Sequence, residues 1–179
     1  MHGVRAGDLG GFVETLDNLS GNGWVSGDGQ VFGNGWVFGN GRVSGYGWVF
    51  GNGWVFGNGR VFGNGRVSDN GRVFDNGRVF GNGWVSGDGR VSRPDHILTI
   101  SDASSEGHHA TLTNQTDDRH LLVIGCLSGT TAKVRAVIES DDWLSGCDKR
   151  TRDLHRPRLL AVVDMCDAHM RAYGWGGVS

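Results

Sequence analysis

Residues 21–92 read GNGWVS GDGQVF GNGWVF GNGRVS GYGWVF GNGWVF GNGRVF GNGRVS DNGRVF DNGRVF GNGWVS GDGRVS. A valine occupies every sixth position from Val25 to Val91, and the same register extended backwards reaches Leu19 and Val13. Apolar residues recur at a period near 3.6 in a helix and near 2 in a strand, so neither explains a period of six. A chain that turns a corner every six residues does explain it, and three such units close one coil of about eighteen residues.

This geometry assigns a place to each position of the repeat. Each valine points inward, and the glycine two residues before it also faces the interior near a corner. The Gly-Asn and Gly-Asp pairs form the corners, because Gly and Asn tolerate the positive φ that tight corners demand. The residues on either side of the valine face solvent, with Trp, Arg or Gln before it and Phe or Ser after it.

Residues eighteen apart are then expected to stack from coil to coil at a spacing of about 4.8 Å. Stacked aromatic rings, and Arg over Trp, favour such a register by about 0.5–1 kcal/mol per exposed pair. We expect about four regular coils and a partial one, forming a prism about 20 Å long. The predicted outer columns are Trp24, Arg42, Arg60 and Arg78; Gln30, Trp48, Arg66 and Trp84; and Trp36, Trp54, Arg72 and Arg90, with Phe38, Phe56 and Phe74 beside the third.

The repeats and the lead-in AGDLGGFVETLDNLSGNGWVS, from Ala6 to Ser26, resemble phage- and prophage-encoded hexapeptide-repeat proteins. The repeats of that family read GNARVYGNARVS, and a GDLGGWVE-like run precedes NLS in its lead-in. The resemblance covers roughly residues 5 to 100 and implies a left-handed parallel β-helix rather than an activity. Where the family has Ala, this chain has Gly at nearly every repeat. We expect each lost methyl to destabilise the coil by about 0.5–1 kcal/mol.

The sequence divides into a lead-in and cap at residues 1–18, a β-helix at 19–93 and a small α+β domain at 94–179. Phe12, Val13, Leu16 and Leu19 are expected to begin the first coil and partly cover its end. Pro94 closes the repeats because it lacks the amide hydrogen that a further coil would use.

The C-terminal domain is expected to contain an antiparallel meander of strands at residues 96–100, 109–113 and 120–126. A helix follows a cap at residues 128–131 and runs to about residue 140, and residues 141–150 form a loop. A second helix begins around Pro157, and a frayed tail starts at Tyr173. The residues expected on or near one face of this helix are Leu159, Leu160, Val163, Cys166 and Met170.

Composition narrows the classes of partner. The 179 residues carry a net charge of −2. Residues 24–92 hold six Arg and four Asp, and this net charge of +2 is far smaller than the positive charge expected of a surface that binds nucleic acid. Three cysteines without a CxxC pair indicate a reducing compartment. No export signal or apolar span is present, so the sequence predicts a cytoplasmic protein with neither membrane nor nucleic acid as partner.

The sequence gives little support to the interpretation of this chain as an enzyme or as a metal-dependent protein. Hexapeptide acyltransferases use a histidine on the coil or an inserted loop, and γ-type carbonic anhydrases need three histidines on zinc. No histidine lies between His2 and His96, and no loop interrupts the repeats. We therefore expect no catalytic residue, no cofactor and no metal. Six His and Cys residues of the C-terminal domain, considered as a metal site, match no zinc spacing closely, namely His108, His109, His120, Cys147, Cys166 and His169.

Two sets of residues are candidates for binding. The aromatic columns Trp36, Trp54, Phe38, Phe56 and Phe74 form a strip of a few hundred Å², a size that often marks an interface. The alternative is that these rings only set the coil register. The column Arg42, Arg60 and Arg78 has the chemistry to grip a phosphate-bearing partner. The preferred interpretation of this column is a solvated ladder partly neutralised by Asp69 and Asp75.

These observations predict a non-enzymatic β-helical scaffold or interaction protein of phage origin, forming a homo-oligomer, a trimer or dimer, through its aromatic and arginine faces. A host or phage protein is a further candidate partner. The first alternative is a counter-defence protein that binds or sequesters a nucleotide-like small molecule. The second, disfavoured alternative is an enzyme similar to hexapeptide acyltransferases.

Overall fold

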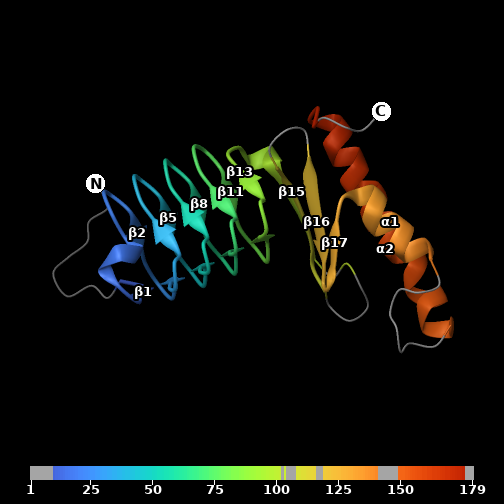
Figure 1. The fold of residues 1–179 in the computed structure, drawn as a ribbon, viewed down its shortest axis with the longest axis horizontal. Helices are drawn as coiled ribbons and strands as arrows, with labels where there is room; N and C mark the ends of the chain where they lie inside the picture. Colours follow the sequence, from blue (N-terminus) through green and yellow to red (C-terminus); the bar gives the residue numbers. More distant parts are fainter. Residues whose placement is uncertain (1–9, 102, 104–107, 116–118, 141–148, 176–179) are drawn as a thin grey trace. The chain divides into compact units, whose positions relative to one another are not determined.

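The computed structural model describes residues 10–101, 103, 108–115, 119–140 and 149–175 (Figure 1). The chain forms two compact units, residues 1–94 and residues 95–179. Among the described residues, no helix combines the length and the apolar character needed to cross a membrane.

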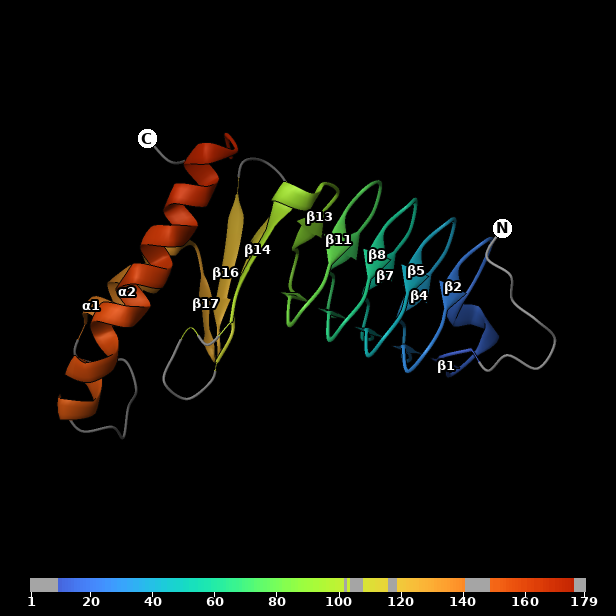
Figure 2. The ribbon, with the colours of Figure 1, turned by 180° about the vertical axis from the view of Figure 1, so that it is seen from behind.

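The first unit is a parallel β-solenoid of about four turns (Figures 1 and 2). Each strand contains two residues, and three parallel sheets run along the solenoid in the orders β1-β3-β6-β9-β12, β13-β10-β7-β4 and β11-β8-β5-β2. The strands are β1 Phe12–Val13, β2 Trp24–Val25, β3 Gln30–Val31, β4 Trp36–Val37, β5 Arg42–Val43, β6 Trp48–Val49, β7 Trp54–Val55, β8 Arg60–Val61, β9 Arg66–Val67, β10 Arg72–Val73, β11 Arg78–Val79, β12 Trp84–Val85 and β13 Arg90–Val91.

The strand register confirms the predicted columns. Arg42 pairs with Arg60 and Val43 with Val61, and the other regular coils repeat this offset of eighteen residues. The valines from Val25 to Val91 are buried, so each coil contributes three valines to one continuous internal column. A solenoid of this kind buries its apolar residues only by stacking each turn on the next.

The corners are built as the sequence predicts, with two exceptions. The first corner residue has a left-handed backbone throughout, as in Gly39 with a φ of 60°. Asparagines at the next position form ladders, and the Asn40 side chain donates a hydrogen bond to the Asn58 side chain at 3.4 Å. At two corners an aspartate adopts the left-handed conformation instead, Asp69 with φ 53° and Asp75 with φ 49°. Such a backbone is costly for residues other than glycine.

The expectation that each buried glycine simply lacks a stabilising methyl group does not hold at every repeat. A Cβ added at Gly53 would lie 2.6 Å from the Val67 carbonyl oxygen, so the backbone leaves no space for it. At Gly47 the nearest atom would be the Ser44 carbonyl oxygen at 3.1 Å, a tight but more tolerant contact. The glycines before sheets β4-β7-β10 and β5-β8-β11 are the close ones, and those before β3, β6 and β9 are looser.

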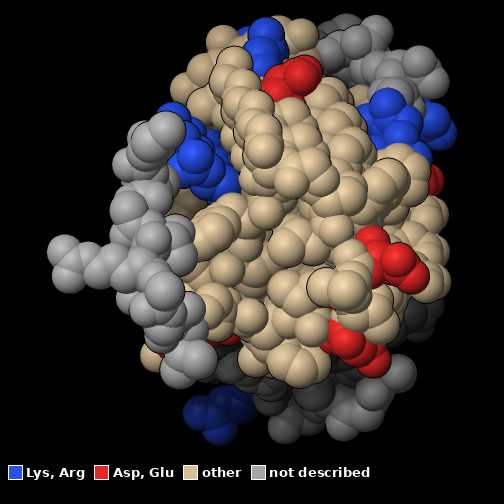
Figure 3. All heavy atoms as spheres, turned by 90° about the vertical axis from the view of Figure 1, so that its left-hand side faces the viewer, with Lys and Arg blue, Asp and Glu red and all other residues tan. Residues whose placement is uncertain are grey.

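Polar side chains organise the start of the solenoid. A short 3-10 helix, η1 (Leu16–Asn18), ends at the buried Asn18, whose amide donates to the carbonyl oxygens of Gly33 and Gly35, both at 2.8 Å. The expectation that Leu16 helps to cover this end is wrong, because its side chain is 91% exposed. Uncharged residues occupy the centre of this end, and charged ones lie around its rim (Figure 3). Residues 1–9 of the predicted cap lie outside the described residues.

The second unit is an antiparallel sheet in the order β14-β15-β16-β17 with two helices. Helix α1 packs on β16 and β17, and helix α2 packs on α1 and β14. The three predicted strands are confirmed, and β17 is an addition, formed because residues 125–126 make a turn. The elements are η2 Pro94–His96, β14 Ile97–Ile100, β15 Ala110–Asn114, β16 His120–Ile124, β17 Leu127–Gly129, α1 Thr131–Glu139 and α2 Lys149–Ala172.

The core of this unit lies between the sheet and the helices and includes Leu112, Leu122, Ile138, Val163 and Met170. Helix α1 begins as predicted, with the Thr130 hydroxyl accepting the Lys133 amide hydrogen. On the outside, Arg135 of α1 forms ion pairs with Asp164 at 2.6 Å and Asp167 at 3.1 Å on α2.

Two expectations for the C-terminal unit are wrong. Helix α2 begins at Lys149, and Pro157 lies inside it, because a proline removes one backbone hydrogen bond without preventing a long, packed helix from continuing. The predicted frayed tail contains the buried Trp175, whose ring lies edge-on to His96 and His169 at 6.1 and 5.3 Å. Residues 141–148 of the predicted loop, and residues 176–179, lie outside the described residues.

Candidate binding surfaces of the solenoid

The first candidate surface is the aromatic face, which we define as Trp36, Trp54, Phe38, Phe56 and Phe74. The Phe38 and Phe56 rings stack at 4.8 Å with 4° between their planes, and Phe56 and Phe74 stack at 5.1 Å with 6°. The valines of the coil fix this arrangement, because they hold successive strands in a register of eighteen residues. The structure therefore brings the five predicted aromatic residues together on one sheet.

Each ring of the aromatic face is half-buried, because its neighbours cover part of it. Trp36 lies edge-on to Trp54 at 5.8 Å, and the indole of Trp36 donates a hydrogen bond to the Ser20 hydroxyl at 3.1 Å. The Arg72 guanidinium lies 4.6 Å from the Trp54 ring centroid, a cation–π contact. The result is an ordered apolar surface with arginine at its far end.

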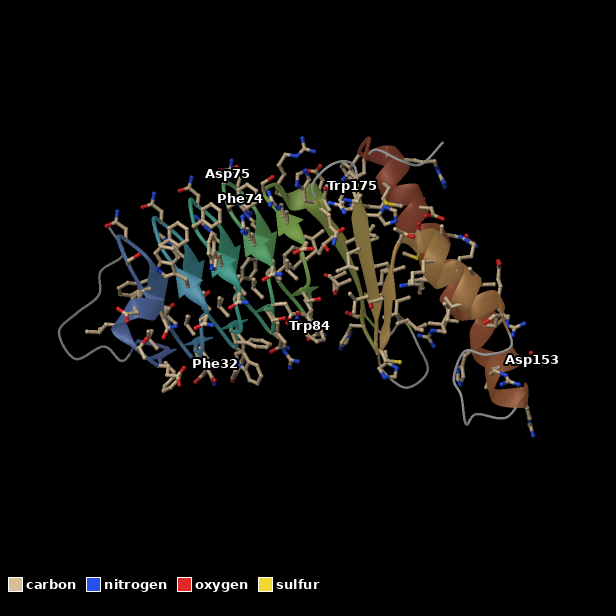
Figure 4. The ribbon with its side chains drawn as sticks, viewed as in Figure 1. Phe32, Phe74, Asp75, Trp84, Asp153 and Trp175 are labelled. Carbon is tan, nitrogen blue, oxygen red and sulfur yellow. The ribbon has the colours of Figure 1, made fainter. Side chains whose placement is uncertain are left out.

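A second aromatic stack lies on another face, where the sequence analysis did not identify one. Phe32 stacks on Phe50 at 5.2 Å, and Arg66 lies 4.9 Å from the centroid of Trp48. Figure 4 shows Phe74 and Phe32 on opposite sides of the solenoid. The period of eighteen residues already relates Phe32 to Phe50, so the sequence contained this signal.

The second candidate surface is the arginine groove, on the sheet β2-β5-β8-β11. It is a shallow groove of about 360 Å³, and Arg42, Arg60 and Arg78 line its length. Trp24, Phe62 and the two serines Ser26 and Ser44 form the rest of its lining. The predicted arginine column is therefore confirmed as a structural unit, but it lies on a different face from the aromatic one.

The expected neutralisation of this column is not found as ion pairs. Within the described ranges, Arg42, Arg60 and Arg78 form no ion pair with any carboxylate. The Asp69 carboxylate instead accepts hydrogen bonds from the Ser68 hydroxyl and the Gly87 amide, both at 3.4 Å.

The serines explain why this face is hollow. On the other two sheets phenylalanine follows the valine at the corresponding inner coils, and its ring fills the space beside the outer column. Ser26 and Ser44 leave that space open. The sequence placed Trp24 in this column without marking it as a binding residue, and Ser26, Ser44 and Phe62 were missed. A serine in one repeat becomes meaningful only beside its neighbour eighteen residues away.

His120 and Cys166 occupy packing positions in the second unit, and Cys147 lies outside the described residues. No group of three or more His, Cys, Asp or Glu residues suited to a metal ion occurs among the residues that the structure describes. His120 accepts a hydrogen bond from the Thr131 amide at 2.9 Å, and burial lowers its pKa, although the Asp167 charge acts in the opposite direction. Burial raises the pKa of the Cys166 thiol to about 12, so this thiol is protonated at neutral pH.

A comparison with known protein families, curated proteins and solved structures finds no match for this chain. The resemblance to phage- and prophage-encoded repeat proteins stays a prediction from the sequence.

Proposed function

We propose that this chain is a non-enzymatic β-helical scaffold, wound left-handed from hexapeptide repeats, that associates with further copies of itself through the aromatic face. The observation that carries the proposal is the stack of Phe38, Phe56 and Phe74, with Trp36 and Trp54 beside it, on one side of the solenoid. Trp, Phe and Arg are enriched at protein interfaces, and Trp and Arg are among the residues that contribute most to binding energy there.

We favour a second copy of this chain as the partner at the aromatic face, because its rings repeat at the same spacing along the solenoid. Rings on successive coils are separated by about 4.8 Å, the distance between neighbouring strands. A second solenoid lying alongside presents its rings at the same interval, so contacts made at one coil recur at the next. A partner without a β-sheet on its surface would not repeat these contacts from coil to coil.

The size of the aromatic face limits the strength of the association. A stable interface buries about 800 Å² on each partner, whereas five half-buried aromatic side chains expose a few hundred Å². The aromatic face alone therefore supports a concentration-dependent dimer or trimer. The flanking Arg72 and Arg90 extend the contact, and they make it sensitive to salt.

The solenoid sequence offers no residue suited to catalysis, and this supports the proposal that the scaffold is non-enzymatic. The coil contains no histidine between His2 and His96 to serve as a general base, and no loop interrupts its repeats. The winding direction is proposed from the repeat sequence and its family resemblance, and an experimentally determined structure tests it.

The test is light scattering after size exclusion, repeated at several protein concentrations, with native mass spectrometry on the same peak. We expect a discrete oligomer for the wild-type chain and a monomer for Trp36→Ser/Trp54→Ser/Phe56→Ser. The matched control is Phe32→Ser/Trp48→Ser/Phe50→Ser, which removes a similar stack from another face. A wild-type monomer at every concentration, or equal dissociation of both triple variants, would refute self-association through the aromatic face.

A further inference from the structure

The arginine groove differs in chemistry from one end to the other along the solenoid. Its outer column begins with one aromatic residue, Trp24, and continues with Arg42, Arg60 and Arg78 on the next three coils. The strands that carry these residues are neighbours in one sheet, so their backbones lie about 4.8 Å apart. Trp24 is 39% exposed, so part of its indole is available to a ligand.

The serines of the groove have unused hydrogen-bonding capacity. On the other sheets a serine one coil below a tryptophan accepts that residue's indole N–H, as Ser20 does from Trp36 and Ser68 does from Trp84, at 3.1 and 2.8 Å. The residues equivalent to these tryptophans beside Ser26 and Ser44 are Arg42 and Arg60.

Neither Ser26 nor Ser44 forms a side-chain hydrogen bond with another residue of the described part of the chain. Both are half-buried and line the groove. The groove thus offers two hydroxyls and three guanidiniums, and the guanidiniums have no carboxylate partner among the described residues. Guanidinium groups bind phosphate oxygens through paired N–H donors.

We propose that the arginine groove binds a nucleoside triphosphate, with the base stacked on Trp24 and the phosphate chain running along Arg42, Arg60 and Arg78. The order of the column, one flat aromatic followed by three cations, matches the order of the ligand, one flat base followed by three phosphates. The hydroxyls of Ser26 and Ser44 face the ribose and the first phosphate. This site is independent of the aromatic face and of self-association.

A single nucleotide fits this surface better than a nucleic acid strand does. Proteins that bind single strands stack successive bases on successive aromatic residues, whereas only the first residue of this outer column is aromatic. Phe62, beside Arg60, is stacked on Phe80 at 5.6 Å and forms part of the groove lining. A bare phosphate chain would use the arginines and leave Trp24 without a role.

Isothermal titration calorimetry of the full chain tests the proposal with three probes: ATP, inorganic triphosphate and adenosine. We expect one ATP per chain, bound more tightly than either other probe. Arg60→Gln should weaken ATP binding about tenfold or more, since a hydrogen bond to a charged group is lost. Trp24→Ser should weaken ATP binding about fivefold or more and leave triphosphate binding unchanged.

The controls are Arg66→Gln and Trp84→Ser, which lie on another sheet. Trp84 is 38% exposed, close to the value for Trp24, so the two tryptophan variants are matched. Circular dichroism spectra establish that each variant is folded. The proposal is wrong if ATP does not bind, if triphosphate binds as tightly as ATP, or if Arg66→Gln weakens binding as much as Arg60→Gln does.

Discussion

The close approach of successive coils at the buried glycines makes a sharp prediction for two chemically identical substitutions. Gly53 and Gly47 both lie two residues before a buried valine, and neither has a positive φ, so alanine is conformationally acceptable at both. They differ in the space available to a methyl group. At Gly53 the nearest atom would be the Val67 carbonyl oxygen at 2.6 Å, and at Gly47 the Ser44 carbonyl oxygen at 3.1 Å.

The free energies of unfolding follow from two opposing effects. Replacing Gly by Ala reduces the entropy of the unfolded chain and stabilises the fold by about 0.4–1 kcal/mol where the methyl fits. Forcing a methyl into a packed site costs about 1–3 kcal/mol. We therefore expect Gly53→Ala to lose about 1–2 kcal/mol, and Gly47→Ala to change stability by less than about 0.5 kcal/mol.

Thermal unfolding followed by circular dichroism measures the difference. A loss of 1 kcal/mol lowers Tm by about 4–8 °C for a unit of about 90 residues, so the two variants should be clearly separated. Equal melting temperatures, or a higher Tm for Gly53→Ala, would show that the coils are not as closely spaced at Gly53 as the structure has them.

Three further predictions concern single residues. Asp75→Gly should stabilise the solenoid by about 0.5–1 kcal/mol, because glycine adopts the left-handed φ of 49° without strain, although it also raises the entropy of the unfolded chain. Urea unfolding measures the change, and a loss of stability would contradict the prediction. Iodoacetamide at pH 8 should label the exposed Cys126 and not the buried Cys166, whose pKa is raised to about 12. Peptide mass mapping follows the labelling, and equal rates of reaction at the two cysteines would disprove this prediction. Burial lowers the pKa of His120, so the unfolded chain binds a proton that the folded chain does not, and stability should fall as pH drops below about 6.5. The variant His120→Gln should show a smaller fall between pH 7.5 and 5.5, and an unchanged pH dependence would refute the assignment.

The solenoid was predictable because its register is repeated at every coil. The valine period alone placed Trp36 over Trp54 and Arg42 beside Arg60, and the structure pairs them in this way. A sequence does not report the distance between neighbouring backbones. The expectation that glycine leaves an empty methyl site therefore failed at Gly53, where the coils approach too closely for a methyl.

The features that the sequence did not predict depend on single side chains rather than on the repeat. Leu16 looked like part of a cap, but its side chain is exposed, and the buried Asn18 bonds to the carbonyl oxygens of Gly33 and Gly35 instead. Pro157 looked like the start of a helix, yet it lies eight residues inside α2. The groove at Ser26 and Ser44 depends on two serines eighteen residues apart, at places where the other two sheets have phenylalanine.

The central claim is that three repeats close one coil, since this places every residue of both candidate surfaces. Asn40→Cys/Asn58→Cys tests it directly, because those side chains lie within 3.4 Å and stacked strands separate Cα atoms by about 4.8 Å, within disulfide range. The control is Asn40→Cys/Asn52→Cys, twelve residues apart. After mild oxidation, tryptic cleavage at Arg42 and Arg60 and mass mapping should find the 40–58 disulfide and no 40–52 disulfide. A 40–52 disulfide formed as readily as the 40–58 one would mean that the coil does not close after three repeats, and that other residues make up both surfaces.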